Sequence, residues 1–442
     1  MSTRIVVVGG GTAGARLAQR LPVTLLGEEP HAPYNRVLLA DVLAGRYAPE
    51  VIALPGTREP VRLGVRAVRI DRAARTVECA DGSLVGYDRL VLATGSNPVL
   101  PPLRGLRGRG GAELPEGVHA FRTLDDCLAL RDRVRPGTRA VVIGGGLLGV
   151  SAARALAALG AEVMLTQQGE RLMERQLDAS ASDLLREHVE SLGVEVHTEC
   201  RVSGLRQRDG EVTAVELADG FVLDAQVVVL ACGVRPRVAL AREAGLAVAT
   251  GIVVDDALRT SDPYIHAIGD CAEHGGRVYG LAGPALEQAD ALTEVLLSET
   301  STTPCGQSSL RAGRMPTTGV DAAPAEHTAT TGVGTAPAEH APTTGYTGTR
   351  ALTRLTLGGA TPLDLAAFGE TTARPGDDVV QLTDATRRAY RKVVVRGDRL
   401  VGGVLLGDLA AVGTLARAWE GDEALPDEAP LLHLLTHDGG SS

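Results

Sequence analysis

Aromatic residues and lysine are scarce in this 442-residue chain. Aromatic residues account for 2% of it, against 44% for all hydrophobic residues, so the core has to be built from Ala, Val and Leu. Lys392 is the only lysine, and arginine supplies nearly all of the positive charge. The net charge is −10, which argues against a nucleic-acid partner, because such partners favour a basic surface.

Long hydrophobic runs are missing as well. No apolar run reaches the ~18 residues that suggest a membrane-spanning helix, and the acidic balance gives no reason to expect a membrane partner. The N-terminal stretch MSTRIVVVGGG passes straight into a strand and a glycine turn, which leaves no room for a signal peptide. These features predict a cytoplasmic protein.

The six cysteines stand apart, at positions 79, 127, 200, 232, 271 and 305. Because no Cys-x-x-Cys occurs, the sequence has neither a redox dithiol nor the spacing of an iron–sulfur or zinc site. We expect buried, reduced thiols. His327 and His340 lie in a low-complexity segment, and the i,i+4 pair His433 and His437 has no third ligand, so no metal site is expected.

Two strand–turn–helix–strand patterns organise the first part of the chain. The first runs from IVVV through GGGTAGARLAQRL to PVTLLGEE, and residues 140–168 repeat this plan. Two such units favour two dinucleotide-binding domains of Rossmann type over one. Shorter strand-like runs at 89–93 and 226–231 each lead into a glycine.

Residues 299–348 have a different composition. TTGVDAAPAEHTA is followed by TTGVGTAPAEHAP, a 13-residue period rich in Thr, Pro, Gly and Ala. The period is too short for the usual solenoid units, and the segment has no apolar face to bury, so we expect a disordered linker or an exposed loop. Strand-like and Ala/Leu-rich stretches return over residues 349–442 and predict a small α+β domain.

The first glycine motif is Gly9-x-Gly11-x-x-Gly14. Gly9 permits a tight turn, Gly11 lets the backbone approach a pyrophosphate, and Gly14 lets the helix pack closely on the strand. The helix N-terminus then offers free N–H groups to the phosphates. Glu28 follows at the end of the second strand, where a carboxylate can accept from ribose hydroxyls.

The second glycine motif is Gly144-x-Gly146-x-x-Gly149, and the roles of its glycines are the same. Its ribose position holds Gln167, which can form hydrogen bonds but has no charge. A third feature is TSDPYIHAIGDCA, where an apolar run ends in Gly269-Asp270. Here the aspartate can bond a sugar-like hydroxyl.

The order of these motifs resembles a known family. Both glycine motifs, ATGSNP (93–98), ACGVRP (231–236) and AIGDCA (267–272) look like those of the two-dinucleotide flavoprotein family of pyridine-nucleotide reductases. The segments 27–45, 121–126, 174–178 and 390–395 are most similar to the flavin portion of assimilatory nitrite reductase large subunits. Rubredoxin and ferredoxin reductases are close relatives of that portion.

The resemblance implies an α/β fold with two Rossmann-like domains and two cofactors, FAD and NAD(P)H. The FAD-binding domain would comprise residues 1–118 and 225–298, split by an inserted NAD(P)H-binding domain at 119–224. The segment 299–348 and the C-terminal α+β domain at 349–442 would follow.

The resemblance also implies roles for particular residues. Gly9, Gly11 and Gly14 would hold the FAD pyrophosphate and Glu28 the adenosine ribose. Arg36 and Arg122 would lie along the FAD, Thr94 and Gly95 would pack near it, and Asp270 would bind the ribityl chain. Gly144, Gly146 and Gly149 would face NAD(P)H, with Gln167 at the ribose position and Gly233 near the nicotinamide end.

Three positions depart from the family pattern: Ser151 and Gln167 stand where relatives carry glutamate, and Ala40 stands where they carry serine. Two function hypotheses therefore remain open. The first is an FAD-dependent NAD(P)H:acceptor oxidoreductase, connected through the resemblance with nitrite or nitrate assimilation. The alternative is an FAD-binding protein with a degenerate nicotinamide site, acting as a binding or electron-transfer module.

In the first hypothesis the flavin carries the chemistry, so no catalytic acid–base pair is expected. Without an internal dithiol, electrons would leave to an external acceptor protein of iron–sulfur or haem type. No nucleic acid, no membrane and no particular oligomeric state are implied.

Overall fold

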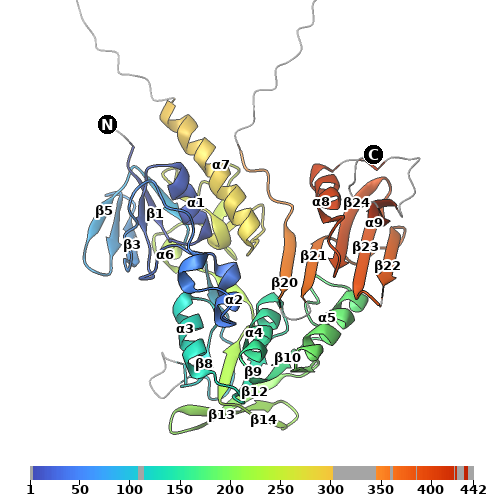
Figure 1. The fold of residues 1–442 in the computed structure, drawn as a ribbon. Helices are drawn as coiled ribbons and strands as arrows, with labels where there is room; N and C mark the ends of the chain where they lie inside the picture. Colours follow the sequence, from blue (N-terminus) through green and yellow to red (C-terminus); the bar gives the residue numbers. More distant parts are fainter. Residues whose placement is uncertain are drawn as a thin grey trace, which may run out of the picture.

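The computed structural model describes residues 3–107, 114–301, 345–358, 362–384, 386–422, 424–425 and 433–436. These residues form two α/β domains and a smaller C-terminal domain (Figure 1). Most of the expected low-complexity segment, residues 302–344 with His327 and His340, lies outside the described residues, as does His437.

The first domain has a parallel four-stranded sheet in the order β18-β6-β1-β2. Its strands are near-continuous apolar runs, as in parallel sheets that are covered on both faces. They are β1 (Ile5–Val8), β2 (Thr24–Leu26), β6 (Arg89–Leu92) and β18 (Ile265–Ala267). The helices α1 (Thr12–Arg20) and α7 (Ala282–Ser301) pack together beside this sheet (Figure 1). A small antiparallel sheet completes the domain with β3 (Ala67–Asp71), β4 (Thr76–Cys79) and β5 (Leu84–Gly86).

The second domain has a parallel five-stranded sheet in the order β11-β10-β9-β15-β8. Its strands are β8 (Val118–His119), β9 (Arg139–Ile143), β10 (Glu162–Thr166), β11 (Val194–His197) and β15 (Val227–Leu230). The helices are α3 (Leu124–Arg133), α4 (Leu147–Ala158) and α5 (Ala179–Ser191). An antiparallel meander of β12 (Val202–Arg208), β13 (Glu211–Leu217) and β14 (Val222–Asp224) precedes β15.

The strand pairing bears on where the second domain ends. Residues 225–298 were expected to belong to the first domain, yet β15 pairs in parallel with β9 over Val227–Leu230. The sequence could not reveal this, because VVVL fits either parallel sheet equally well. We therefore propose that the boundary follows Leu230. Short segments then return the chain to the first domain: β7 (Ser96–Pro98) pairs with β16 (Val234–Pro236), and α6 (Ala239–Glu243), β17 (Ile252–Val254) and β19 (Ala272–His274) follow.

Both ends of the expected 299–348 segment belong to the first domain instead. Helix α7 continues to Ser301. On the other side, Tyr346 is buried in the core of the first domain at 4% exposure. We therefore propose narrower limits for this segment, since repeat composition gives no warning of a single anchoring aromatic residue.

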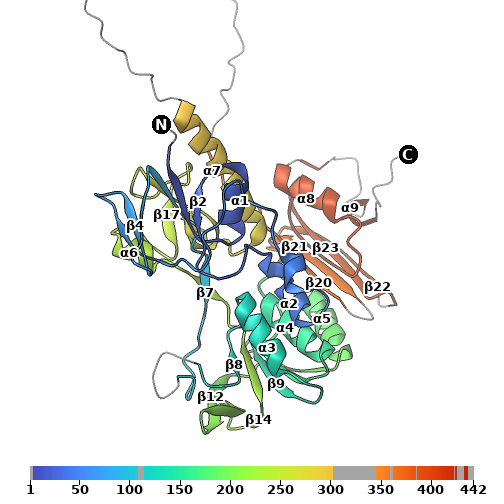
Figure 2. The same ribbon diagram turned by 60° about the vertical axis from the view of Figure 1, so that its left-hand side comes forward.

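The C-terminal domain is an antiparallel sheet in the order β20-β21-β24-β23-β22. Its strands are β20 (Leu352–Leu357), β21 (Leu363–Gly369), β22 (Asp378–Asp384), β23 (Ala389–Arg396) and β24 (Arg399–Leu406), followed by α8 (Val412–Gly421) and α9 (His433–Thr436). One face of the sheet packs against α8, where the rings of Phe368 and Trp419 lie 5.2 Å apart. The other face packs on the second domain (Figure 2).

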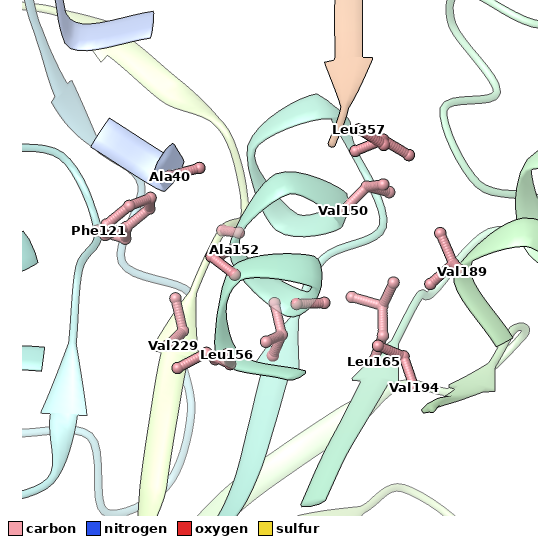
Figure 3. Packing of buried hydrophobic residues seen from close by; sticks show 14 of the residues in the cluster. Ala40, Phe121, Val150, Ala152, Leu156, Leu165, Val189, Val194, Val229 and Leu357 are labelled. Atoms are coloured by element: carbon pink, nitrogen blue, oxygen red, sulfur yellow. The ribbon is translucent and has the colours of Figure 1, made fainter. Parts of the chain in front are cut away.

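This domain contact is a continuous apolar core. Leu357 of β20 and Val150 of α4 belong to one buried cluster with Leu156, Leu165 and Val189 of the second domain (Figure 3). The same cluster reaches α2 (Leu39–Leu43) of the first domain through Ala40. Apolar burial stabilises folded proteins by roughly 25 cal/mol per Å² of surface, so this shared core stabilises the contact between the three domains.

One polar contact reinforces this core. Asp178 caps the N-terminus of α5, accepting from the Ala181 N–H at 3.1 Å. Its other oxygen accepts from Lys392 Nζ at 2.7 Å and from the Tyr390 hydroxyl at 2.6 Å. Burial alone would raise the pKa of the Asp178 carboxyl, but these hydrogen bonds outweigh it and the pKa is lowered. The only lysine of the chain thus joins the C-terminal domain to the second domain.

Candidate functional site

The first glycine motif forms a tight turn between β1 and α1. Gly9 has a φ of +116°, and a Cβ there would lie 2.1 Å from the Ala93 carbonyl oxygen. A Cβ on Gly14 would lie 2.0 Å from the Gly9 carbonyl oxygen, so only glycine allows the helix to approach the strand this closely. At Gly11, by contrast, a Cβ would meet no atom of the described residues within 4 Å. The two outer glycines shape the turn, and the middle one faces open space.

Helix α1 begins at this open space. Gly11 is its N-cap, no side chain of the described residues caps it, and its first turn has no acidic residue. The first N–H groups of such a helix have no partner within the helix, and the helix dipole favours negative charge there. The turn is therefore suited to a phosphate group.

The second glycine motif has the same geometry. Gly144 has a φ of +114°, and its Cβ would lie 2.4 Å from the Ala231 carbonyl oxygen. A Cβ on Gly149 would lie 1.8 Å from the Gly144 carbonyl oxygen, and one on Gly146 would meet nothing within 4 Å in the part of the chain that the structure describes. Gly146 caps α4, which also lacks a capping side chain and an acidic first turn within the described chain. The described residues thus contain two glycine turns of one design, and each is suited to a phosphate group.

A cavity of about 950 Å³ opens beside the first turn. Seven of the residues predicted for the flavin site line it: Gly9, Gly11, Glu28, Arg36, Thr94, Gly95 and Arg122. Gly14 and Asp270 do not line it, because Gly14 lies behind the turn and Asp270 is reached through Arg122. The other predicted residues lie outside this cavity. The glycines of the second motif and Gln167 belong to the second domain, and Gly233 follows β15 at the end of that domain.

Glu28 stands at the end of β2, as expected from the motif. Its Oε2 accepts from Arg237 Nη1 at 2.6 Å, and the two side chains are 42% and 41% exposed. Arg237 also donates its backbone N–H to the Gly95 carbonyl at 2.9 Å, and its own carbonyl accepts from the Thr94 hydroxyl at 2.8 Å. The segment after ACGVRP therefore closes one side of the cavity, a role that sequence analysis missed.

The buried Tyr34 and the half-buried Arg36 form a polar group beside the cavity. Arg36 pairs with Glu29, and its Nη1 donates to the Tyr34 hydroxyl at 3.0 Å and to the Arg122 carbonyl at 3.0 Å. The Tyr34 hydroxyl donates to Glu29 at 2.6 Å and accepts from the Leu124 N–H at 2.8 Å. Burial raises the pKa of Tyr34, so its hydroxyl stays protonated at neutral pH. Tyr34 and Glu29 were missed, although both flank the predicted Arg36 closely in sequence.

Asp270 is oriented by two side chains from distant parts of the sequence. Its Oδ2 accepts from Arg122 Nη2 at 2.8 Å and from the Ser96 hydroxyl at 2.9 Å, and Arg122 also donates to Ser96 at 2.7 Å. Ser96 belongs to the ATGSNP motif, whose role had been assigned only to Thr94 and Gly95. The structure brings Arg122 and Asp270 together as expected of one site.

The ribose position of the second motif has a specific arrangement. Gln167 Oε1 accepts a hydrogen bond from the Gly145 N–H at 2.8 Å, so the side chain folds back onto its own glycine turn. The Ser151 hydroxyl donates to the Leu147 carbonyl at 2.8 Å, within α4, and is 8% exposed. Gly233 has a φ of +94° just after β15, and its carbonyl accepts from the Val99 N–H at 2.9 Å.

The five described cysteines are free thiols. Burial raises the pKa of Cys127 to about 12, and burial also raises the pKa of Cys232 and Cys271. These thiols therefore stay protonated at neutral pH and are poor nucleophiles. Within the described ranges no three His, Cys, Asp or Glu side chains gather as metal ligands. The helices in those ranges are all too short or too polar to cross a lipid bilayer.

The sequence and the fold match known proteins. Residues 3–289 match the model of the pyridine nucleotide-disulphide oxidoreductase family, and residues 359–421 match that of the rubredoxin NAD+ reductase C-terminal domain. The large subunit of nitrite reductase [NAD(P)H] from Klebsiella oxytoca is 33% identical, over 98% of this chain and 42% of that protein. The assimilatory nitrate reductase electron transfer subunit of Bacillus subtilis is 35% identical, over 92% of this chain and 48% of that protein.

The solved structures agree on the fold. A ferredoxin reductase from Rhodopseudomonas palustris aligns with a TM-score of 0.77 at 25% identity, over 98% of both chains. Putidaredoxin reductase in its covalent complex with putidaredoxin also gives 0.77, at 23% identity over the full length of both. The chain spans about half the length of the curated nitrite and nitrate reductase relatives. These matches confirm the resemblance drawn from the motifs: the chain belongs to the pyridine nucleotide-disulphide oxidoreductase family.

Proposed function

We propose that this chain is an FAD-dependent NAD(P)H:acceptor oxidoreductase that passes electrons to a separate redox protein. The observation that carries the proposal is the pair of matched glycine turns, each opening at an uncapped helix N-terminus, within the residues described. Two turns of this kind suit two dinucleotides. The family membership supports the same assignment.

The residues at the first turn fit FAD. The space over Gly11 and the N–H groups of α1 suit the pyrophosphate, and the exposed Glu28 carboxylate suits a ribose. Asp270, held by Arg122 and Ser96, suits the hydroxyls of a ribityl chain. When bound, the flavin supplies electron transfer between a nicotinamide and an acceptor, and the protein supplies positioning and electrostatics.

The second turn would hold the nicotinamide nucleotide. Gly144 and Gly149 shape the turn, and the space over Gly146 suits the pyrophosphate. The Gln167 carbonyl oxygen already accepts from the Gly145 N–H. Gln167 would therefore contact the adenosine ribose through its amide nitrogen.

For the acceptor we propose an iron–sulfur protein of ferredoxin or rubredoxin type, with a haem protein as the wider possibility. The matches to a ferredoxin reductase structure and to a rubredoxin reductase C-terminal domain support this choice. The likeness to nitrite and nitrate reductase subunits supports a place in nitrite or nitrate assimilation. We further propose a cytoplasmic location, which suits the free thiols of the described residues.

Two observations favour a second function, an FAD-binding protein with a degenerate nicotinamide site. Gln167 engages one N–H of the second glycine turn, and Ser151 hydrogen-bonds within its own helix. Either feature would weaken a nucleotide contact. Such a protein would bind FAD and receive electrons from a donor other than NAD(P)H.

Anaerobic mixing distinguishes the two functions. The purified, FAD-loaded protein is mixed with NADH or NADPH, and the flavin absorbance is followed in a stopped-flow instrument. We expect bleaching with at least one nucleotide. Dithionite serves as the control that the flavin can be reduced, and bleaching with dithionite alone would favour the second function.

A further inference from the structure

The turn that carries Asp270 is held by a side chain outside every motif discussed above. Gln288 lies in α7 and is 1% exposed. Its Oε1 accepts a hydrogen bond from the Gly269 N–H at 2.7 Å, one residue before Asp270. Gly269 has a φ of +77°, and a Cβ there would lie 3.0 Å from the Ala13 side chain of α1. The turn is therefore enclosed between α1 and α7, and Gln288 satisfies its N–H.

The other end of the Gln288 amide reaches the segment that follows residue 344. Its Nε2 donates to the Tyr346 hydroxyl at 3.5 Å. That hydroxyl lies 2.6 Å from the Thr349 hydroxyl, which donates to Glu287 at 2.7 Å. A hydroxyl has one proton, so Thr349 must accept from Tyr346, and Tyr346 must accept from Gln288. The donor direction is fixed along the whole series, which also fixes which end of the amide faces Gly269.

The far end of this series is firmly placed. Tyr346 is 4% exposed, and its N–H donates to the Asp256 carbonyl at 2.6 Å. Its ring makes edge contacts with His274 at 4.9 Å and Tyr279 at 6.5 Å between ring centres. Burial raises the pKa of Tyr346 to about 12, so the hydroxyl keeps the proton that the series requires.

We propose that Gln288 is a positioning residue for the flavin, which fixes the Gly269–Asp270 turn and couples it to Tyr346. The inference rests on the proposed flavin site. Arg122 and Ser96 hold the Asp270 carboxylate, whereas Gln288 holds the backbone that precedes it. Asp270 is thus held at its carboxylate by Arg122 and Ser96 and at the preceding backbone by Gln288. Gln288 in turn contacts Tyr346, which follows the segment 302–344.

The main test is Gln288→Met, which keeps the length of the side chain but removes both hydrogen-bonding ends. It leaves the Gly269 N–H without its acceptor. We expect the dissociation constant for FAD, measured by flavin fluorescence, to rise roughly tenfold. In the FAD-saturated variant, the visible absorption bands and the midpoint potential of the flavin should also shift, because Asp270 is no longer held in place.

A second variant tests the far link. Tyr346→Phe keeps the ring contacts but removes the acceptor for Gln288 Nε2. We expect a smaller rise of about threefold in the dissociation constant, with a spectral shift in the same direction. This variant also decides the matter if Gln288→Met does not fold.

Thr293→Val provides the matched control. Thr293 lies in the same helix, is 3% exposed, and donates to the Ala289 carbonyl at 2.8 Å without reaching the turn. FAD affinity and spectrum should be unchanged in this variant. The proposal is overturned if Gln288→Met and Tyr346→Phe keep the wild-type affinity and spectrum, or if Thr293→Val weakens FAD as much as Gln288→Met. A wild-type chain that binds no FAD would instead contradict the proposed function.

Discussion

Replacing Gln167 with glutamate tests how the second glycine turn selects its nucleotide. In the wild-type protein the side-chain carbonyl accepts from the Gly145 N–H at 2.8 Å, so the other end of the amide carries only N–H donors. Glutamate keeps an oxygen for Gly145 and turns the other end into a charged acceptor. That acceptor can bond the ribose hydroxyls of NADH, and its charge repels the 2′-phosphate of NADPH.

The size of the effect follows from the charge. Hydrogen bonds to charged groups contribute ~1.5–3 kcal/mol, against ~0.5–1.5 kcal/mol for neutral pairs. A difference of about 1–1.5 kcal/mol corresponds to roughly a five- to tenfold change in affinity. We therefore expect the wild-type protein to accept both nucleotides weakly. Gln167→Glu should bind NADH roughly tenfold more tightly and NADPH more weakly.

The assay is the anaerobic rate of flavin reduction against nucleotide concentration, for both nucleotides. Gln168→Glu is the matched control, because it adds the same charge at the next residue, which is exposed. An equal change in the NADH to NADPH ratio in both variants would show that charge alone is responsible and would refute the reasoning from Gly145. If neither nucleotide reduces the flavin in any variant, the second turn has lost its function.

Three further outcomes are expected. Gly11→Ala should fold but lose FAD, whereas Gly146→Ala should keep FAD and lose reduction by NAD(P)H, because a Cβ at either position meets no described protein atom within 4 Å. Circular dichroism and flavin content check this, and an unfolded Gly11→Ala would contradict it. Lys392→Met should lower the free energy of unfolding at neutral pH by about 3 kcal/mol, because Asp178 loses a buried partner, as chemical denaturation would show. Since the pKa of Asp178 is lowered in the folded protein, the stabilisation by the Lys392–Asp178 pair is lost as the pH falls through that pKa. Unchanged stability of Lys392→Met at neutral pH would contradict the prediction. The purified chain with NAD(P)H alone should not reduce nitrite at enzyme-like rates, since the sequence has no cysteine after Cys305 to ligate a cluster; rapid nitrite consumption would overturn this.

The two glycine turns could be predicted from sequence because their causes are local. Gly9 and Gly144 need a positive φ, and the following glycines need close backbone contact within one turn of helix. Apolar runs such as IVVV likewise predict buried parallel strands. The family-wide order of motifs implied that Arg122 and Asp270 both lie near the FAD, but not that the two side chains contact each other.

Contacts between distant segments could not be predicted. Glu28 and Arg237 meet only because β16 pairs with β7 and brings the chain back beside the cavity. The expected bounds placed β15 in the first domain, although its sequence fits either sheet. Its pairing with β9 supports the boundary that we propose after Leu230. Tyr346 is a single residue at the edge of a repetitive segment, and its burial depends on a pocket made by the first domain.

The two turns share a backbone design but differ in the side chain at the end of the second strand. In the first domain Glu28 pairs with Arg237 and does not cap α1. The start of this helix therefore stays available to a cofactor. In the second domain Gln167 Oε1 accepts from the Gly145 N–H, so this donor of the turn is already engaged before a nucleotide binds. A reductase must keep its flavin through many turnovers but release its nicotinamide in each one. A turn with one N–H already engaged offers one hydrogen-bond donor fewer to a phosphate, so it binds the phosphate less strongly. The amide at Gln167 therefore suits an exchangeable nucleotide, and its neutrality accounts for the relaxed choice between NADH and NADPH that we expect.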